Sequence, residues 1–498
     1  MTEVSIVILS ALSCFVSLYY IWLMQLNGYF FLRAYKSLIF NTFFLLSAFF
    51  SIAQLLISLF WAKAALYSAI IFCAALTPFL FAKKKVPLIF TRRVIRWILI
   101  LFVIYLSLNF FCDGYILPIV FLPVTLFANI LAMPIEQIVN AYYIKKAHNK
   151  LINSKCTVIS IVGSYAKTSV KNILKAFLST KYKVEASPNS FNTPLGLAKF
   201  INSIDLTQDM LVILEKGAKK VNDIKKLCKL YPPTHAIVTG ITGQHLSTFK
   251  TLSNIIKAKS EIMNFLSQDG FCVLNADDIN SSGCFLKGDA KKISVGKNSK
   301  DYAISDVSVG ISGTSFLLTE NANRYKVKTP LLSSINALNI SLALALAHKL
   351  NCDIDKMLNV AAFLPYVPHR LELIVSHNGY IIDDSYNANT EGVKGLTEVL
   401  STYKGKKIIV SQGIVELGVR AYEQNFILGE KLSEIADICY LTGINADAIA
   451  DGLKKGKTEE HKIIKVNNIN EAVKDMQKYV SENSVIVFQN DLPDNFKN

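Results

Sequence analysis

One stretch, Val158 to Leu174, constrains the fold of this chain more than any other; it reads VISIVGSYAKTSVKNIL. Its β-branched start predicts a buried strand that stops at Gly163, and Lys167-Thr168 then opens a helical pattern. Strand, tight loop, Lys-Thr pair and helix are typical of a phosphate-binding loop, in which backbone N–H groups and the helix N-terminus surround anionic oxygens. In such a loop the lysine reaches the terminal phosphates and the threonine hydroxyl binds Mg²⁺. The residues predicted to bind ATP here are Gly163, Ser164, Ala166, Lys167, Thr168 and Ser169.

The loop departs from its usual pattern at one position. Ala166 stands before the lysine, where glycine is usual, so an ordinary turn before a helix remains an alternative for this stretch taken alone. A methyl group is tolerable at this point if the backbone φ angle stays negative.

Residues 1 to about 140 are nearly continuous apolar sequence, whereas the rest of the chain has an ordinary soluble composition. Most of the apolar segments approach the roughly 20 residues that cross a bilayer as a helix. The first is too long, and too uncharged at its start, for a cleaved signal peptide. The segments are Val4–Met24, Leu38–Phe60, Ala64–Phe81, Trp97–Phe111 and Tyr115–Met133. They predict a membrane region, residues 1–146, with about five transmembrane helices.

The charges between these segments predict an orientation. With five spans, one side of the membrane receives Arg33, Lys36, Lys83, Lys84, Lys85, Arg92, Arg93, Arg96, Lys145 and Lys146, and the other receives Lys63, Glu3 and Asp113. This asymmetry is the one the positive-inside rule requires. We therefore expect a multi-pass protein of the cytoplasmic (inner) membrane, with its N-terminus outside and its catalytic domains in the cytoplasm. The helices would serve as an anchor or as a platform for a lipid-linked substrate. No charged residue lies in the middle of a predicted span, so nothing in the sequence indicates ion transport.

Charge and cysteine content exclude other classes of protein. The net charge is +16, but no Arg-rich tract is interleaved with aromatic residues, so we expect no nucleic-acid partner. The nine cysteines form no Cys-x-x-Cys pair, which favours buried free thiols in a reducing compartment.

From about Lys150 the pattern changes to strands that alternate with helices, which predicts a parallel sheet covered on both faces. Helical patterns lie at Val170–Leu178, Val221–Leu230, Leu252–Leu266 and Asn336–Leu350. A smaller α/β unit starts near His369, after the linker LPYVPHR. The predicted fold is thus a multi-spanning helical membrane region followed by a P-loop parallel-sheet ATPase domain (147–366) and a smaller Rossmann-like α/β C-terminal domain (367–498).

Further motifs follow the loop in a fixed order. They are SPNSFNTPLGLAKFIN, VILEKGAKKVNDIKKL, PTHAIVTGITGQHLSTF, IIKAKSEIM, VLNADD, SSINALNISLALALA, HRLEL and IIDDSYNAN, and VELG lies in the last domain. Together they resemble the Mur ligase superfamily, ATP-dependent amide-forming enzymes of peptidoglycan synthesis and their relatives. The motifs are most similar to the branch that adds D-alanyl-D-alanine. The resemblance runs from about Val158 to the C-terminus.

The resemblance implies a reaction of a carboxylate, an amine and ATP that gives an amide, ADP and phosphate through an acyl phosphate. The implied partners are a cell-wall precursor, either a UDP-linked or a lipid-linked muropeptide, and an amino acid or dipeptide amine. The implied cofactors are ATP and Mg²⁺. Asn336 is similar to the adenine-contacting Asn of the family, Arg370 to the Arg that clamps ATP phosphates, and Asp384 to the ATP-contacting Asp. Asn192 and Thr193 are candidates on the substrate side.

The implied metal site consists of Thr168, Glu215, His245 and Lys259. Glu215 ends a strand and offers the hard oxygen that Mg²⁺ prefers, although an exposed Glu would look the same in the sequence. His245 and Lys259 are assigned by the resemblance, since a loop His and a solvated helix Lys are the ordinary alternatives. In the family the lysine matching Lys259 carries a CO₂-derived carbamate, which turns a cation into an oxygen ligand. Lys167, Lys259 and His245 would be the catalytic residues.

The chain also departs from the family outside the loop. Gly240 stands where Asn is common, Thr390 replaces a Pro, and VFQNDLPDN replaces a Lys-Gly-Ser-Arg-type ending. The UDP-sugar-binding N-terminal domain is replaced by the apolar region, which suggests a lipid-linked or membrane-delivered muropeptide. Three alternatives stay open: a ligase of the same chemistry on another polymer, a catalytically inactive ATP-binding scaffold, and, more weakly, a transporter ATPase.

Overall fold

A computed structural model of the 498-residue chain describes two compact units. The first comprises residues 1–142 and 493–497, and the second residues 143–492 and 498. The described residues are 3–26, 29, 87–111, 121–243, 246–285, 287–377, 379–386, 390–415, 417–456, 459 and 462–489, with scattered residues between 45 and 78. All that follows concerns these residues.

The described part of the first unit contains α1 (Glu3–Leu26), α6 (Arg92–Phe111) and the first part of α7 (Phe121–Ser154). Its helices pack through a hydrophobic cluster that includes Trp97 and Tyr105, both fully buried. Polar groups join the same helices: Ser17 Oγ lies 2.8 Å from Tyr105 Oη, and Arg96 pairs with the buried Glu136 at 2.5 Å. Much of the apolar sequence here therefore forms a helical core.

The predicted multi-spanning membrane region is wrong. Among the described residues, one helix is long and apolar enough to cross a membrane, Pro123–Ser154, and a core helix can pass the same test. The distal part of this helix supplies Ala147 and Leu151 to the core of the α/β unit. The predicted segments Leu38–Phe60 and Ala64–Phe81 lie largely outside the described residues, as does the start of Tyr115–Met133.

The predicted multi-pass localisation is wrong as well, because its sidedness depended on five spans. Two of the cations assigned to one side of a membrane have partners within the unit. Arg96 pairs with Glu136, and the guanidinium of Arg93 lies 3.8 Å from the centre of the Tyr29 ring. Contacts within the unit therefore account for these two arginines, without a membrane surface.

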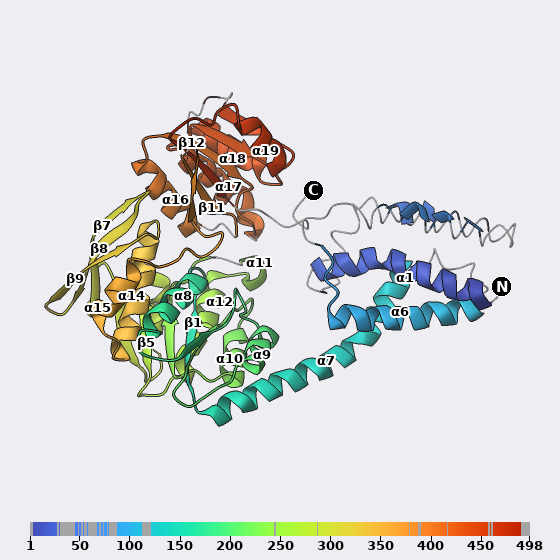
Figure 1. The fold of residues 1–498 in the computed structure, drawn as a ribbon, viewed down its shortest axis with the longest axis horizontal. Helices are drawn as coiled ribbons and strands as arrows, with labels where there is room; N and C mark the ends of the chain where they lie inside the picture. Colours follow the sequence, from blue (N-terminus) through green and yellow to red (C-terminus); the bar gives the residue numbers. More distant parts are fainter. Residues whose placement is uncertain are drawn as a thin grey trace. The chain divides into compact units, whose positions relative to one another are not determined.

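The second unit begins with a nine-stranded sheet in the order β2-β3-β1-β4-β5-β6-β7-β8-β9. Figure 1 shows β7, β8 and β9, the strands at one end of this order, side by side. Neighbours from β2 to β7 are parallel, whereas β7, β8 and β9 are antiparallel, so the sheet is mixed and the prediction of a parallel sheet is incomplete. The strands are β1 (Thr157–Val162), β2 (Val184–Ala186), β3 (Leu211–Glu215), β4 (His235–Val238), β5 (Phe271–Asn275), β6 (Lys291–Gly296), β7 (Tyr302–Gly310), β8 (Gly313–Glu320) and β9 (Asn323–Thr329).

Helices cover both faces of this sheet, as the alternating pattern predicted. On one face α8, α14 and α15 pack on strand residues such as Ile159 and Ile237. On the other face α9, α10, α12 and the end of α7 pack on residues such as Val158 and Leu214. The helices are α8 (Lys167–Leu178), α9 (Pro194–Ser203), α10 (Asp223–Leu230), α11 (Leu246–Phe249), α12 (Leu252–Ser260), α13 (Ser282–Phe285), α14 (Ser334–Lys349) and α15 (Ile354–Ala361). Short 3₁₀ turns lie at Glu261–Phe265 and Ile279–Ser281.

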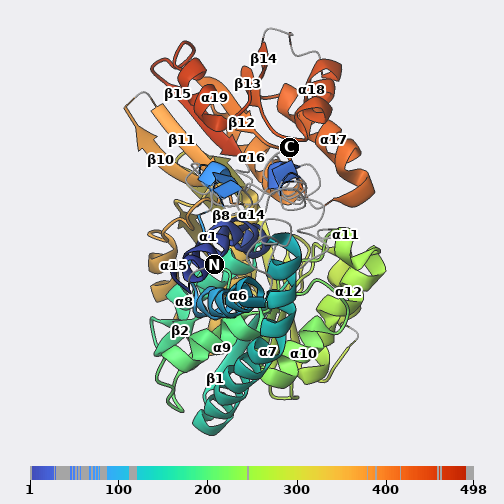
Figure 2. The ribbon, with the colours of Figure 1, turned by 90° about the vertical axis from the view of Figure 1, so that its right-hand side faces the viewer.

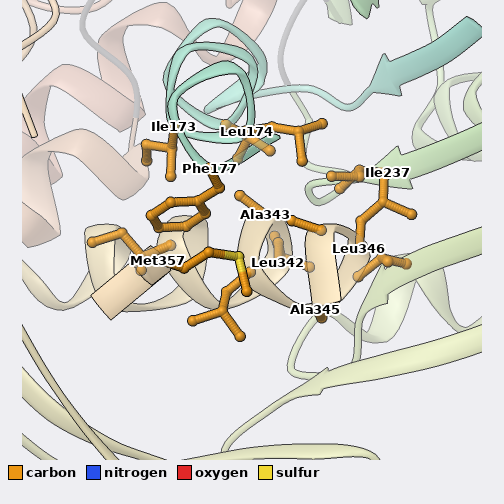
Figure 3. Close-up of a cluster of buried hydrophobic side chains, with 14 of the residues drawn as sticks. Ile173, Leu174, Phe177, Ile237, Leu342, Ala343, Ala345, Leu346 and Met357 are labelled. Carbon is orange, nitrogen blue, oxygen red and sulfur yellow. The ribbon is translucent and has the colours of Figure 1, made fainter. Parts of the chain in front are cut away.

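The core between α8 and α14 fixes the position of the phosphate-binding loop. Figure 3 shows Phe177 of α8 facing Leu342 and Ala343 of α14, with Met357 of α15 beside them. Each of these side chains is fully buried. Burying a Phe or Leu side chain contributes about 2 kcal/mol, so this contact, near the C-terminal end of α8, holds the helix against α14.

The last part of the chain forms a six-stranded sheet in the order β10-β11-β15-β12-β13-β14, which Figure 2 shows above the first sheet. β10 and β11 are antiparallel, and the other neighbours are parallel. α16, α17 and α18 cover one face and α19 the other. The strands are β10 (Glu372–Ser376), β11 (Gly379–Asp384), β12 (Lys406–Ser411), β13 (Ile438–Leu441), β14 (Ile463–Lys465) and β15 (Ser484–Gln489). The helices are α16 (Thr390–Thr402), α17 (Ala421–Ser433), α18 (Ala446–Lys455) and α19 (Ile469–Met476), with a 3₁₀ turn at Gly418–Arg420.

Candidate functional site

The predicted phosphate-binding loop joins β1 to α8. Its backbone is held by the loop that follows β4: Ser164 N–H donates to Gly240 O at 2.7 Å, and Thr239 Oγ1 donates to Tyr165 O at 2.6 Å. Gly163 has no room for a side chain, because a Cβ there would lie 2.0 Å from Thr239 Oγ1. The loop is therefore built by contact between two neighbouring strand ends.

Ala166 adopts the left-handed conformation, with φ +57° and ψ 1°, directly before α8. The condition that its φ stay negative is thus not met. An L-residue in this region costs roughly 1–2 kcal/mol, which glycine avoids. The loop keeps the backbone that a glycine would give and accepts this strain.

A buried carboxylate lies opposite the loop. Glu215, at the end of β3, is 2% exposed. Its Oε2 accepts a hydrogen bond from Thr168 Oγ1 at 2.8 Å, and its Oε1 accepts one from Asn192 Nδ2 at 3.1 Å. The structure thus joins three residues that lie far apart in the sequence. The arrangement offers two oxygen donors, from Thr168 and Glu215, of the kind that Mg²⁺ prefers.

Lys171 is a fully buried cation in the same cluster, one helical turn after Lys167. Its Nζ lies 3.6 Å from Glu215 Oε2, and it also donates to Asn189 O. Burial lowers the pKa of Lys171, Arg370 lowers it further, and Glu215 opposes the shift. None of the sequence motifs pointed to Lys171, although its spacing of four from Lys167 places the two lysines on the same face of the helix.

Lys167 lies half-buried at the first position of α8, where its Nζ donates to Ser164 O at 3.2 Å. Burial lowers its pKa, and Arg370 adds to that shift while Glu215 opposes it. An ammonium folded back onto its own loop is free to turn toward an incoming anion at the cost of one backbone hydrogen bond.

Lys259 stands in the last turn of α12 and is 3% exposed. Its pKa is lowered to about 7, mainly by burial and also by the charge of Lys167, while Glu215 and Asp223 oppose the shift. Burial at this position thus favours the uncharged amine over the ammonium ion.

His245, one of the predicted metal ligands, lies outside the described residues. Thr193 is described, and its hydroxyl caps α9 by accepting Gly196 N–H at 3.2 Å. Asn192 is fixed by Glu215 and by Gly217, since Gly217 N–H donates to Asn192 O at 3.0 Å. A Cβ at Gly217 would lie 2.8 Å from the Asn192 side chain, so this glycine makes room for the amide.

A cavity opens beside the loop, between α8, α14 and the start of the last domain. It brings together five predicted residues, Ala166, Ser169, Asn336, Arg370 and Asp384. Asn336 Nδ2 donates to Leu332 O at 2.7 Å, and its Oδ1 accepts from Asn339 Nδ2 at 3.1 Å. Asn339 also lines the cavity, and its buried Oδ1 has no hydrogen-bond partner within the described part of the chain. An unsatisfied amide oxygen next to a cavity suits a donor on a ligand, such as the amino group of a base.

Arg370 and Asp384 reach the cavity from the linker and from the end of β11. Asp384 Oδ1 accepts Leu371 N–H at 3.3 Å. The pKa of Asp384 is raised to about 7, mainly by burial and also by Asp383, while the Leu371 N–H and Arg370 oppose the shift. The guanidinium of Arg370 lies 4.5 Å from the centre of the Tyr386 ring. Around Glu215 and the cavity, the described site presents the basic side chains of Lys167, Lys171 and Arg370, and this positive charge suits a polyanionic ligand.

Comparisons with known families agree with this arrangement. Residues 161–347 match the Mur ligase middle domain, and residues 369–489 match the Mur ligase, glutamate ligase domain. The UDP-N-acetylmuramoyl-tripeptide–D-alanyl-D-alanine ligase of Escherichia coli (strain K12) is 28% identical over 55% of this chain and 61% of its own length. The enzyme of the same name from Bacillus subtilis (strain 168) is 31% identical over 52% of this chain and 57% of its own length. The chain thus spans about three fifths of the length of these relatives.

Solved structures give the same fold. MurF from Acinetobacter baumannii superposes with a TM-score of 0.64 over 70% of this chain and 77% of that chain, at 22% identity. The MurF ligase from Thermotoga maritima in complex with ADP gives a TM-score of 0.62 over 70% of this chain and 80% of that chain, at 27% identity. Residues 1–160 lie outside the two matched domains.

Proposed function

Because the chain carries the middle domain of the Mur ligases over residues 161–347 and their C-terminal domain over residues 369–489, we propose that it is an ATP-dependent ligase that forms an amide bond. The observation that carries this proposal is a cluster of side chains: Thr168 and Lys171 both contact Glu215. The loop that precedes Thr168 borders a cavity lined by Asn336 and Arg370. A phosphate-binding loop, an oxygen-rich metal site and a closing arginine are the parts that phosphoryl transfer to a carboxylate requires.

The donor proposed is a UDP-linked muropeptide, and the amine is D-alanyl-D-alanine. These are the substrates in the names of the relatives from E. coli and B. subtilis. None of the comparisons supports a lipid-linked donor, so the UDP-linked form is the one proposed. In the first step the substrate carboxylate oxygen attacks the γ-phosphorus of ATP, and ADP leaves. In the second step the amine nitrogen attacks the acyl carbon, phosphate leaves, and the amine loses a proton.

The residues of the site divide this work. Lys167 and Arg370 would hold the phosphates, and Asn336 and Asn339 would hold the base through amide donors and acceptors. Thr168 and Glu215 fit Mg²⁺ because both present oxygen atoms to one point. Bound there, the ion would neutralise charge on the transferring phosphoryl group. Lys171 pairs with Glu215 and would balance the charge of this carboxylate when no metal ion is bound.

Lys259 has the chemistry of a carbamate site. Carbon dioxide reacts with an uncharged amine, and burial holds the pKa of this amine at about 7. The carbamate would be an anion close to the ammonium group of Lys167, which stabilises its charge. A ¹³C-bicarbonate NMR signal near the carbamate shift, present in the wild type and absent in Lys259→Arg, would support this assignment; the same spectrum for both proteins would remove it.

Phosphate release with Mg-ATP tests the ligase. The purified protein is assayed with UDP-linked muropeptides and D-alanyl-D-alanine, separately and together. Release that needs both substrates, and that is lost in Lys167→Ala but kept in Lys175→Ala, supports the proposal. Lys175 is a matched control because it lies on the same helix, where it forms a surface pair with Glu185 at 3.4 Å. Nucleotide binding without turnover would instead favour an ATP-binding scaffold.

A further inference from the structure

The segment from Asn189 to Asn192 is tied at both ends to the surroundings of Glu215. At one end Asn189 O accepts a hydrogen bond from Lys171 Nζ. At the other end Asn192 Nδ2 donates to Glu215 Oε1 at 3.1 Å, and Asn192 O accepts Gly217 N–H at 3.0 Å. Any displacement of this segment therefore moves groups that bond directly to the proposed metal ligand.

The middle of the same segment contacts the last domain through one side chain. Ser190 Oγ lies 2.7 Å from Tyr386 Oη, across 196 positions of sequence. Tyr386 follows β11 by two residues, so it is placed by the strand that ends in Asp384. Its backbone N–H donates to His369 O at 3.1 Å, which attaches it to the linker as well.

Tyr386 also supports the proposed phosphate clamp. The guanidinium of Arg370 lies 4.5 Å from the centre of its ring, within the range of a cation–π contact. One tyrosine thus touches the clamp with its ring face and the Glu215-linked segment with its hydroxyl. These are two different functions of the site, and they meet in one side chain.

We propose that Tyr386 is a positioning residue that couples closure of the last domain on the nucleotide to the placement of the Asn189–Asn192 segment. This proposal rests on the proposed function, since it assigns Arg370 to the nucleotide. When Arg370 engages the phosphates, the ring of Tyr386 moves with it and its hydroxyl fixes Ser190. Binding of the nucleotide then holds the segment, and with it the Asn192 amide on Glu215, more firmly in place while the acyl phosphate forms.

The contacts of Tyr386 are weak enough to form and break in each turnover. Tyr386 is 50% exposed, so neither of its contacts is fully withdrawn from water. A hydrogen bond of this kind changes an equilibrium by about twofold to tenfold, and an exposed cation–π contact by about twofold to fivefold. Such a contact biases closure without preventing the opening that each turnover needs.

Two isosteric changes remove the hydroxyl contact from either side. Tyr386→Phe keeps the ring under Arg370 and deletes the hydroxyl, and Ser190→Ala deletes its partner. We expect each to weaken Mg-ADP binding about threefold, and the double variant to be no weaker than either single one, because they break one bond. Tyr386→Leu removes both contacts, and we expect a loss of about tenfold. Tyr422→Phe is the matched control: its hydroxyl contacts Asp451 on the surface, far along the chain from the site.

Calorimetry of Mg-ADP binding and hydrogen exchange of residues 187–193 read out the coupling. In the wild type we expect bound nucleotide to slow hydrogen exchange in this segment. In Tyr386→Phe and Ser190→Ala we expect bound nucleotide to slow exchange much less. A role in folding alone would change exchange equally with and without nucleotide. Suppose that the wild type binds nucleotide and that both single variants have the same affinity and the same protection from exchange. That result would contradict the role of Tyr386 but not the proposed ligase activity. Additive losses of affinity in the double variant would also contradict the role of Tyr386 alone. A wild type that binds no nucleotide would overturn both.

Discussion

Thr168 Oγ1 lies 2.8 Å from Glu215 Oε2, which connects the first turn of the helix after the phosphate-binding loop to the end of the neighbouring strand. β1 and β3 are parallel neighbours, and Ile161 is paired in register with Glu215. The carboxyl ends of parallel strands meet at one edge of a sheet, which is where α/β proteins place their ligands. This pair therefore forms the centre from which the remaining contacts of the site extend.

Replacing Glu215 by Gln should abolish most of the activity while leaving the fold intact. The amide keeps the size of the side chain and can still accept the hydrogen bond from Thr168, but it carries no charge for a metal ion. We expect phosphate release to fall by about 10²-fold, the scale of losing one preorganised electrostatic contact. Glu185→Gln, a half-exposed carboxylate that pairs with Lys175, is the control and should keep full activity. Equal rates for the two variants would contradict the assignment.

Asp384 should make the stability of the protein fall as the pH rises. Burial raises its pKa from 3.8 to about 7, so between pH 4 and pH 7 the native state holds a proton that the unfolded state lacks. The free energy of unfolding therefore decreases through this window and levels off above it, by at most about 4 kcal/mol for a shift of this size. Urea unfolding at several pH values measures this. In Asp384→Asn the decrease in the free energy of unfolding should be smaller than in the wild type. Identical pH profiles for the two proteins would show that Asp384 does not cause the decrease.

Ala166→Gly should stabilise the protein, against the usual effect of a new glycine. At φ +57° the alanine methyl group costs roughly 1–2 kcal/mol, while glycine costs about 0.5–1 kcal/mol in unfolded-chain entropy, so the net gain is about 0.5–1 kcal/mol. The same substitution at Ala176, inside α8, should destabilise by about 1 kcal/mol. Thermal unfolding of the two variants provides the comparison, and a loss of stability at both positions would show that the loop strain is absent.

Phe177→Ala should destabilise the core under the loop. The side chain is fully buried between α8 and α14, as Figure 3 shows, and its removal leaves a cavity that costs about 3–5 kcal/mol. We also expect weaker nucleotide binding, because the contact holds α8 against α14 and both helices line the cavity. Denaturant unfolding and Mg-ADP calorimetry measure the two effects, and Tyr403→Ala, in the separate core of the last domain, should reduce stability with a smaller effect on binding.

Local pattern was enough to find the strand and helix of the phosphate-binding loop, because strand burial and helix periodicity are properties of neighbouring residues. The helices predicted at Val170–Leu178 and Asn336–Leu350 are present as α8 and α14. The hairpin strands β7 to β9 were missed, although β8 alternates between buried and half-buried residues along its length. The five predicted membrane spans were wrong, because apolar composition records burial and does not distinguish a membrane from a helical core.

The sequence by itself determined the order of the motifs and the identity of the residues that carry charge and oxygen atoms. It also placed Glu215 at a strand end, since that follows from one strand alone. Only the tertiary structure decided which of these residues meet. The left-handed backbone of Ala166, the pairing of Lys171 with Glu215 and the contact of Tyr386 with Ser190 each depend on elements far apart in the chain. Such contacts are set by how strands pair and helices pack, and no local pattern of residues encodes them.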